Sequence, residues 1–187
     1  MLIWKSIGAS VLISFGALGL LYTNYSILSM ILFSFGLITI CTLNLNLFTG
    51  KCGFIFKDKT LHLLDLIVIL ITNIIISYAL GILYGIAYPE IRTIAAEKVS
   101  TWSLDFSYFL KSCCCGVIMY LVVKIFKKYK SVIGICFGIP LFIMCGFQHS
   151  IANATIMGAA SLLSPAILLC VAGNWVGSLF ISALDNS

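Results

Sequence analysis

Six apolar runs fill most of this chain of 187 residues, and each is about long enough to cross the hydrocarbon core of a bilayer. They lie between short polar or charged stretches, near Ser6–Tyr22, Ile27–Leu43, Leu64–Tyr88, Leu104–Ile125, Val132–Met157 and Leu162–Ala183. Because lipid offers no hydrogen-bond partners to the backbone, runs of this kind cross a membrane as helices. We therefore predict an all-α integral membrane protein with six transmembrane helices.

The composition excludes a water-soluble fold. Hydrophobic residues make up 61% of the chain and charged residues only 9%, whereas soluble domains carry about 25% charged residues. Six spans with short loops use up the whole length, so we expect residues 1–187 to form a single transmembrane domain. The first run, which follows Lys5, could also be mistaken for a signal peptide; the repeat described below favours a transmembrane helix.

The net charge of +5 reflects membrane topology, and the chain shows no nucleic-acid-binding pattern. Basic residues fall at the start and in alternate loops, whereas the loops after the first and fifth spans have none. By the positive-inside rule, both termini should lie in the cytoplasm and the protein in the cell membrane. The basic residues that decide this are Lys5, Lys51, Lys57, Lys59, Lys124, Lys127, Lys128 and Lys130. Only the third loop, with Glu90, Arg92, Glu97 and Lys98, then carries charge outside.

The second and fifth spans run into polar, glycine-rich stretches, Leu45–Gly53 and Gly146–Asn153. Unsatisfied backbone groups at this depth cost several kcal/mol each, so these stretches should line a cavity or pack inside the protein. We predict that helices 2 and 5 are broken. Broken helices at corresponding positions of two halves indicate a substrate path.

Two spacings indicate that the halves, about 1–90 and 91–187, form an inverted repeat of three helices each. Thr49 and His149 are 100 residues apart, and Asn73 and Asn174 are 101 apart. His149 is the main functional candidate, because an ionisable residue inside a span is costly and usually functional. The alternative is a packed histidine bonded to a neighbouring helix. Thr49 could orient the imidazole or contact an ion.

Other polar residues have structural and functional interpretations. For Asn73 and Asn174 we favour a structural role, in which the amides satisfy backbone groups of the breaks. Lys111 could face the pore or extend to the outer interface. Lys98 could attract anions at a pore mouth, or could pair with a glutamate in solvent. The eight cysteines have no metal-ligand spacing, and we expect no disulfide, metal or cofactor.

Three motifs resemble the formate/nitrite transporter family. Leu47-Phe48-Thr49-Gly50 is similar to the re-entrant loop motif of the family, Gly146–Asn153 (GFQHSIAN) to its G-F-E-H-S-V-A-N motif, and Gly173–Gly177 (GNWVG) to its G-N-x-x-G motif. The resemblance covers nearly the whole chain. It implies an aquaporin-like protomer, usually assembled as a homopentamer in the lipid bilayer, that passes formate, nitrite, hydrosulfide or similar anions.

The resemblance also assigns roles to residues. It implies that a lysine, best matched by Lys98, draws the anion inward, and that His149, bonded to Thr49, lies between two apolar constrictions. Such constrictions favour anions of weak acids, which can cross as neutral acids. The resemblance places Phe33, Leu37 and Phe142 at the outer constriction and Leu47, Phe48 and Ile118 at the inner one. We expect Asn153, together with Asn73 and Asn174, to support the loops.

Three departures from the family pattern bear on the function. Gln148 replaces a glutamate, Cys115 stands where an asparagine is usual, and the chain is shorter than a typical member. Lys111, one turn from Cys115, could supply the missing donor. Two other functions remain open: a channel for a neutral solute such as ammonia, urea, glycerol or water, and a membrane enzyme or scaffold. An enzyme is disfavoured because no carboxylate or thiol partners His149 at an evident spacing.

Overall fold

A computed structural model describes residues 1–185, and all the regular elements of this part of the chain are helices, with no β-strand. The all-α class predicted from the apolar runs is therefore confirmed. The helices are α1 (Leu2–Tyr22), α2 (Ile27–Thr42), α3 (Phe48–Lys51), the 3₁₀ helix η1 (Cys52–Phe54), α4 (Leu63–Ala87), α5 (Pro89–Ser100), α6 (Phe106–Tyr129), α7 (Ile133–Met144), α8 (Ser150–Ala160) and α9 (Ala166–Leu184).

Four helices, α1, α4, α6 and α9, are long and apolar enough to cross a membrane. Two further apolar helices, α2 and α7, are shorter, with 16 and 12 residues. After α2 the chain leaves helical conformation until Phe48, and after α7 until Ser150. Here residues 43–47 and 145–149 are called the first and second break. The run predicted as one span from Val132 to Met157 thus contains two helices, α7 and α8.

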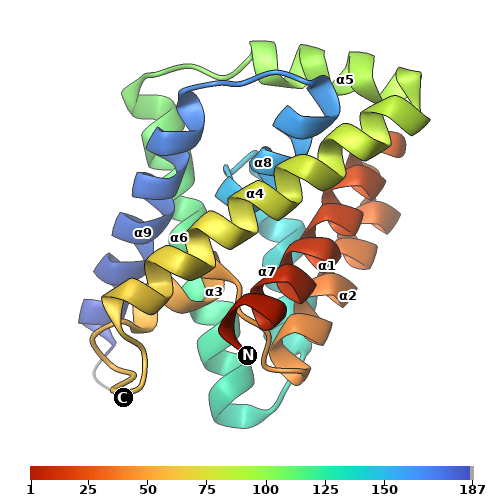
Figure 1. The fold of residues 1–187 in the computed structure, drawn as a ribbon. Coiled ribbons are helices and arrows are strands. Elements are labelled where there is room, and N and C mark those ends of the chain that lie inside the picture. The colour runs from red at the N-terminus through yellow and green to blue at the C-terminus, as the bar shows by residue number, and fades with distance from the viewer. Residues whose placement is uncertain (186–187) are drawn as a thin grey trace.

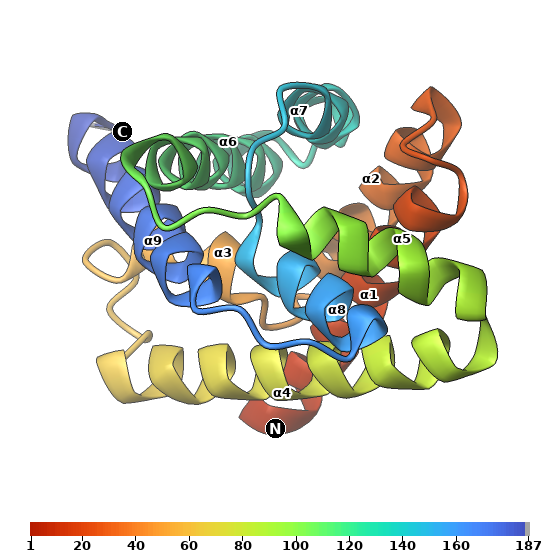
Figure 2. The ribbon, with the colours of Figure 1, turned by 90° about the horizontal axis from the view of Figure 1, so that it is seen from above.

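The short helices α3 and α8 lie inside the bundle (Figure 2). Seen from above, α3 and α8 lie between α4 on one side and α6 on the other (Figure 2). In Figure 1, α5 lies at the top and the loops that follow α2, α6 and η1 lie toward the bottom. We call the first end the α5 end, and the second the basic end, because it holds the lysines of residues 51–59 and 124–130.

Close helix crossings hold α8 and α9 against their neighbours. A Cβ atom placed on Gly158 of α8 would lie 2.0 Å from the carbonyl oxygen of Tyr78 in α4. A Cβ atom on Gly177 of α9 would likewise lie 2.0 Å from the carbonyl oxygen of Cys113 in α6. Only glycine permits backbones to approach this closely, as is common in membrane helix packing. The crossings fix α8 and α9, and with them the second break.

Helix α5 is a feature that the sequence analysis missed, because it treated residues 89–100 as a charged loop. Pro89 occupies the first helical position, where its missing N–H costs nothing. Ile91, Ala95 and Val99 recur every four residues and are buried against α8 and its neighbours. The apolar spacing therefore makes one face of a helix, and Lys98 lies on a defined element.

Candidate functional site

Asn73 in α4 connects the first break to helix α1 through hydrogen bonds. Its Oδ1 accepts a hydrogen bond from the backbone N–H of Phe48 at 2.9 Å. Its Nδ2 donates to the carbonyl oxygens of Asn46, at 3.2 Å, and of Ser6 in α1, at 2.9 Å. The side chain is fully buried, so these bonds satisfy backbone groups that water cannot reach.

Asn174 makes the same arrangement at the second break. Its Oδ1 accepts from the backbone N–H of Ser150 at 2.8 Å, and its Nδ2 donates to the carbonyl oxygens of Gln148, at 2.8 Å, and of Ser112 in α6, at 2.9 Å. Each asparagine thus bonds to its break on one side and to the first long helix of its half on the other. The amides satisfy backbone groups, which is the structural role favoured from the sequence.

The two breaks meet at Thr49 and His149. The Oγ1 of Thr49 lies 2.8 Å from Nε2 of His149, and both side chains are buried, at 1% and 2% exposure. Their elements bring them together because α3 begins one residue before Thr49 and α8 begins one residue after His149. The imidazole thus lies in the interior of the bundle, bonded to a residue 100 positions away.

The second nitrogen of the imidazole identifies the tautomer. Nδ1 of His149 accepts a hydrogen bond from the backbone N–H of Ala152 at 3.1 Å and so caps α8. An accepting Nδ1 carries no proton, so in the neutral ring Nε2 does, and it donates to Oγ1 of Thr49. The hydroxyl proton of Thr49 is then available for another acceptor. Protonation of Nδ1 would break the cap and put a cation at the positive end of α8.

Two cavities approach this pair from opposite ends. The α5-side cavity, about 280 Å³, is lined by His149, Phe33, Phe142 and Lys98, among others. The basic-side cavity, about 560 Å³, is lined by Leu47 and Gly50, on either side of the Phe48–Thr49 pair, and by Lys51, Lys127 and Lys130. His149 therefore lines one cavity, and its partner Thr49 lies next in sequence to Gly50, which lines the other.

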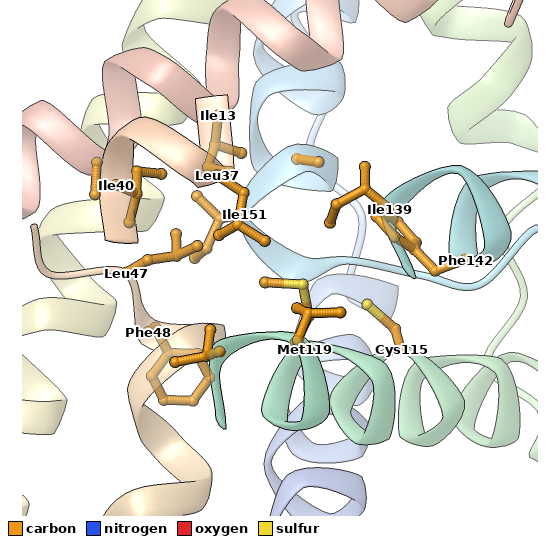
Figure 3. Close-up of a cluster of buried hydrophobic side chains, with 14 of the residues drawn as sticks. Ile13, Leu37, Ile40, Leu47, Phe48, Cys115, Met119, Ile139, Phe142 and Ile151 are labelled. Carbon is orange, nitrogen blue, oxygen red and sulfur yellow. The ribbon is translucent and has the colours of Figure 1, made fainter. Parts of the chain in front are cut away.

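A cluster of buried apolar side chains, which includes Phe48 next to Thr49 in the chain, packs inside the bundle (Figure 3). Most side chains of the cluster are buried. Those labelled in Figure 3 carry no nitrogen or oxygen, and only Cys115 and Met119 contain a heteroatom, sulfur. We call this cluster the apolar layer; its labelled members are Ile13, Leu37, Ile40, Leu47, Phe48, Cys115, Met119, Ile139, Phe142 and Ile151. A bare ion in this layer would lose its hydration without a charged partner, which is costly.

The residues predicted for the outer constriction divide between the two cavities. Phe33 and Phe142 lie edge to face, with ring centroids 6.0 Å apart, and both line the α5-side cavity. Whether Leu37 belongs to the outer constriction stays a prediction, and the side chain itself lines the basic-side cavity. The reason is that Leu37 follows Phe33 by one turn of α2, which runs toward the basic end.

The residues predicted for the inner constriction also differ in their positions. Leu47 lines the basic-side cavity and is 1% exposed. Phe48 is equally buried and packs edge to face against Trp175, with centroids 6.1 Å apart. Ile118 is only partly buried and packs against the core from outside it. Leu47 is thus the member of this set that faces a cavity.

Lys98 lies at the α5-side cavity and has no carboxylate partner. Within residues 1–185 the ion pairs are those of Lys57 and Lys124 with Asp185, so the predicted alternative of a glutamate partner does not occur. The ammonium lies 4.8 Å from the ring centroid of Tyr25, a cation–π contact. Burial, and secondly the positive charge of Lys111, lower the pKa of Lys98 below its ordinary value.

Lys111 and Cys115, one turn apart in α6, have different surroundings. Lys111 is exposed and lines a side pocket that it shares with Lys98, whereas Cys115 is fully buried in the apolar layer. The structure does not bring the ammonium to the position of Cys115. All eight cysteines are free, and no group of His, Cys, Asp or Glu among residues 1–185 could hold a metal ion.

Sequence reasoning missed a polar network around Asn153. Its Nδ2 donates to Oε1 of Gln148 and to the hydroxyl of Tyr108, both at 3.0 Å, and lies 3.8 Å from Sγ of Cys170. Gln148 in turn donates to the carbonyl oxygen of Gly146 at 2.9 Å. The network braces the second break, and the amide at position 148 serves it as both acceptor and donor. Tyr108 and Cys170 gave no signal in the sequence, since both read as apolar span residues.

The chain matches a known protein family. The family described as "Formate/nitrite transporter" matches residues 1–185. The chain belongs to the formate/nitrite transporter family. The resemblance drawn from the motifs around Thr49, His149 and Asn174 is therefore confirmed. No curated protein sequence matches the chain.

Solved structures of this family share the fold. A structure described as "Pentameric formate channel with formate bound" aligns with a TM-score of 0.75 at 15% identity, covering 98% of this chain and 92% of the other. A second, described as "FNT family ion channel", aligns with a TM-score of 0.72 at 19% identity, covering 97% and 85%. The formate/nitrite transporter family and these neighbours are channels and transporters, and the apolar helices are those of a membrane protein.

Proposed function

We propose that this protein conducts small monovalent anions of weak acids, such as formate, nitrite or hydrosulfide, across the cell membrane. The observation that carries the proposal is the buried Thr49–His149 hydrogen bond, whose imidazole lines one lysine-containing cavity and whose threonine is next in sequence to Gly50 in the wall of a second. The apolar layer is packed in the same interior. Lysines at each mouth attract anions, while the layer rejects a bare charge.

In the proposed path, Lys98 draws the anion into the α5-side cavity, where Phe33 and Phe142 strip part of its water. The anion meets the imidazole of His149 and takes a proton before the apolar layer, because the neutral acid loses far less hydration than the ion. Since Nδ1 of His149 already accepts the N–H of Ala152, the proton comes most directly from water beside Lys98, and the hydroxide left behind returns to the solvent at the α5 end. The hydroxyl of Thr49 donates to the acid in transit, and Leu47 lines the exit.

We further propose that α2 with α3, and α7 with α8, are two interrupted spans, which gives six spans in an inverted repeat of residues 1–90 and 91–187. The matched contacts of Asn73 and Asn174 support this arrangement. By the positive-inside rule, the lysines of the basic end support the proposal that this end, with both termini, faces the cytoplasm. The related channel is pentameric, and we propose the same assembly here.

Flux into liposomes that contain the purified protein tests the function. Formate, nitrite and hydrosulfide should each produce rapid uptake in a pH-dye assay, and chloride, the anion of a strong acid, should not. Equal flux of chloride and formate would contradict the weak-acid mechanism. Flux of glycerol without flux of any anion would favour a channel for neutral solutes instead.

A further inference from the structure

A side pocket of about 250 Å³ lies beside the α5-side cavity, and the proposed path does not use it. It is lined by two lysines, Lys98 from α5 and Lys111 from α6, together with Trp102 and Gln148. Lys98 and Gln148 also line the α5-side cavity. The side pocket and the α5-side cavity are therefore adjacent, and Lys98 lines both.

The side pocket concentrates positive charge and hydrogen-bond donors. Neither Lys98 nor Lys111 is ion-paired within residues 1–185. The indole N–H of Trp102 is buried and has no hydrogen-bond partner in this part of the chain. Two ammonium groups in one pocket are matched by an anion with several acceptor oxygens.

The acidic group nearest in sequence to Lys111 is already engaged. The Oδ1 of Asp105 accepts the backbone N–H of Tyr108 at 2.8 Å and caps α6. That bond, and more weakly the charge of Lys111, lower the pKa of Asp105. The carboxylate is exposed to solvent and is not a wall of the pocket. The two ammonium groups thus have no counter-ion inside the pocket.

We propose that the side pocket binds a divalent oxyanion, such as sulfate or hydrogen phosphate, and that the bound dianion inhibits entry of monovalent anions by engaging Lys98. Two ammonium groups favour a double negative charge over a single one. A sulfate ion cannot become a neutral acid at neutral pH, so the apolar layer blocks its passage. The binding stands on the pocket alone, whereas the inhibition rests on the proposed function.

Competition in flux is the first test. Sulfate added to the side of the α5 end should raise the apparent KM for formate about threefold at twice its own Kd, with no change in maximal rate. Gluconate at equal ionic strength, a monovalent control, should do less. With each variant compared to its own flux without sulfate, Lys111→Gln should lose the inhibition and Lys111→Arg should keep it. Lys128→Gln, which alters an exposed lysine at the other end of α6, should also keep it.

Calorimetric titration of sodium sulfate into the purified protein is the second test, and it needs no transport. One sulfate should bind per chain in the wild type and in Lys111→Arg, and none in Lys111→Gln. Sulfate binding without formate flux would reject the proposed function and retain the site. Inhibition that persists in Lys111→Gln, equal effects of sulfate and gluconate, or sulfate binding unchanged by Lys111→Gln would each overturn the proposal.

Discussion

The Oγ1 of Thr49 and the Nε2 of His149 lie 2.8 Å apart, although 100 residues separate them in the chain. The Nδ1 of the same ring accepts the backbone N–H of Ala152. Both ring nitrogens are therefore committed, one as donor and one as acceptor, and the threonine hydroxyl keeps the one free proton of the pair. This arrangement leads to the first prediction.

Replacement of the Thr49 hydroxyl should impair flux without unfolding the protein. In Thr49→Val the side chain keeps its volume but cannot accept from His149 or donate to a permeating acid. Loss of one hydrogen bond of about 1.4 kcal/mol in transit lowers the rate about tenfold. Formate uptake into liposomes measures this, with Thr49→Ser as the control that keeps the hydroxyl. Wild-type rates in Thr49→Val would remove the hydroxyl from the mechanism.

The lowered pKa of Lys98 predicts a pH-dependent contribution to flux. A lysine is charged below its pKa, so Lys98 loses its charge at a lower pH than an ordinary lysine as pH rises. At neutral pH, Lys98→Met should conduct formate several-fold more slowly than the wild type. The ratio of the two rates, measured at equal internal and external pH, should fall toward one on the alkaline side, before pH 10.5 is reached. A ratio that stays constant into that range would show that the charge of Lys98 does not drive entry.

Truncation of either bracing asparagine should destabilise the fold by a similar amount. Asn73→Ala and Asn174→Ala each leave buried backbone groups of a break without partners, at a cost of about 1–3 kcal/mol per group. Thermal unfolding in detergent should show a lower Tm for both. If one variant unfolds at the wild-type temperature, the two breaks are not braced in the same way.

Alanine in place of glycine should destabilise the protein at a close helix crossing and not at an open position of a helix. In Gly177→Ala the new Cβ would lie 2.0 Å from the carbonyl oxygen of Cys113, so α6 and α9 must move apart. Overpacking of this kind costs about 1–3 kcal/mol, and Tm should fall by several degrees. Gly19→Ala in α1 is the matched control, since no atom lies within 4 Å of its Cβ. Equal Tm values for both variants would contradict the packing described for α9.

The sequence predicted the class of the fold because lipid leaves the backbone few choices. Apolar runs of this length must be helical in a membrane, and the predicted ends of α1, α4 and α6 lie within a few residues of the structure. His149 and Asn174 were visible as polar exceptions within apolar runs, and Thr49 as part of the polar stretch that follows the second run. Their motifs also identified the family.

The remaining features depend on three-dimensional contacts that spacing along the chain does not reveal. Helix α5 was not predicted because its charged residues lower the mean hydropathy of residues 89–100. The apolar positions Ile91, Ala95 and Val99 do not raise it enough to indicate a span. That Leu37 lines the basic-side cavity was not predicted, since alignment to a motif gives no depth along a helix. The partners of Asn153 come from three elements, and no linear pattern joins Tyr108 to Cys170.

The apolar layer between the two cavities also bears on the energy supply of a cell that carries this protein. Protons move rapidly along unbroken files of water, whereas buried apolar side chains such as Met119 and Ile151 offer water no hydrogen-bond partner (Figure 3). In our mechanism a proton crosses only as part of a neutral acid. The pathway can therefore stand idle between substrates without short-circuiting the proton-motive force.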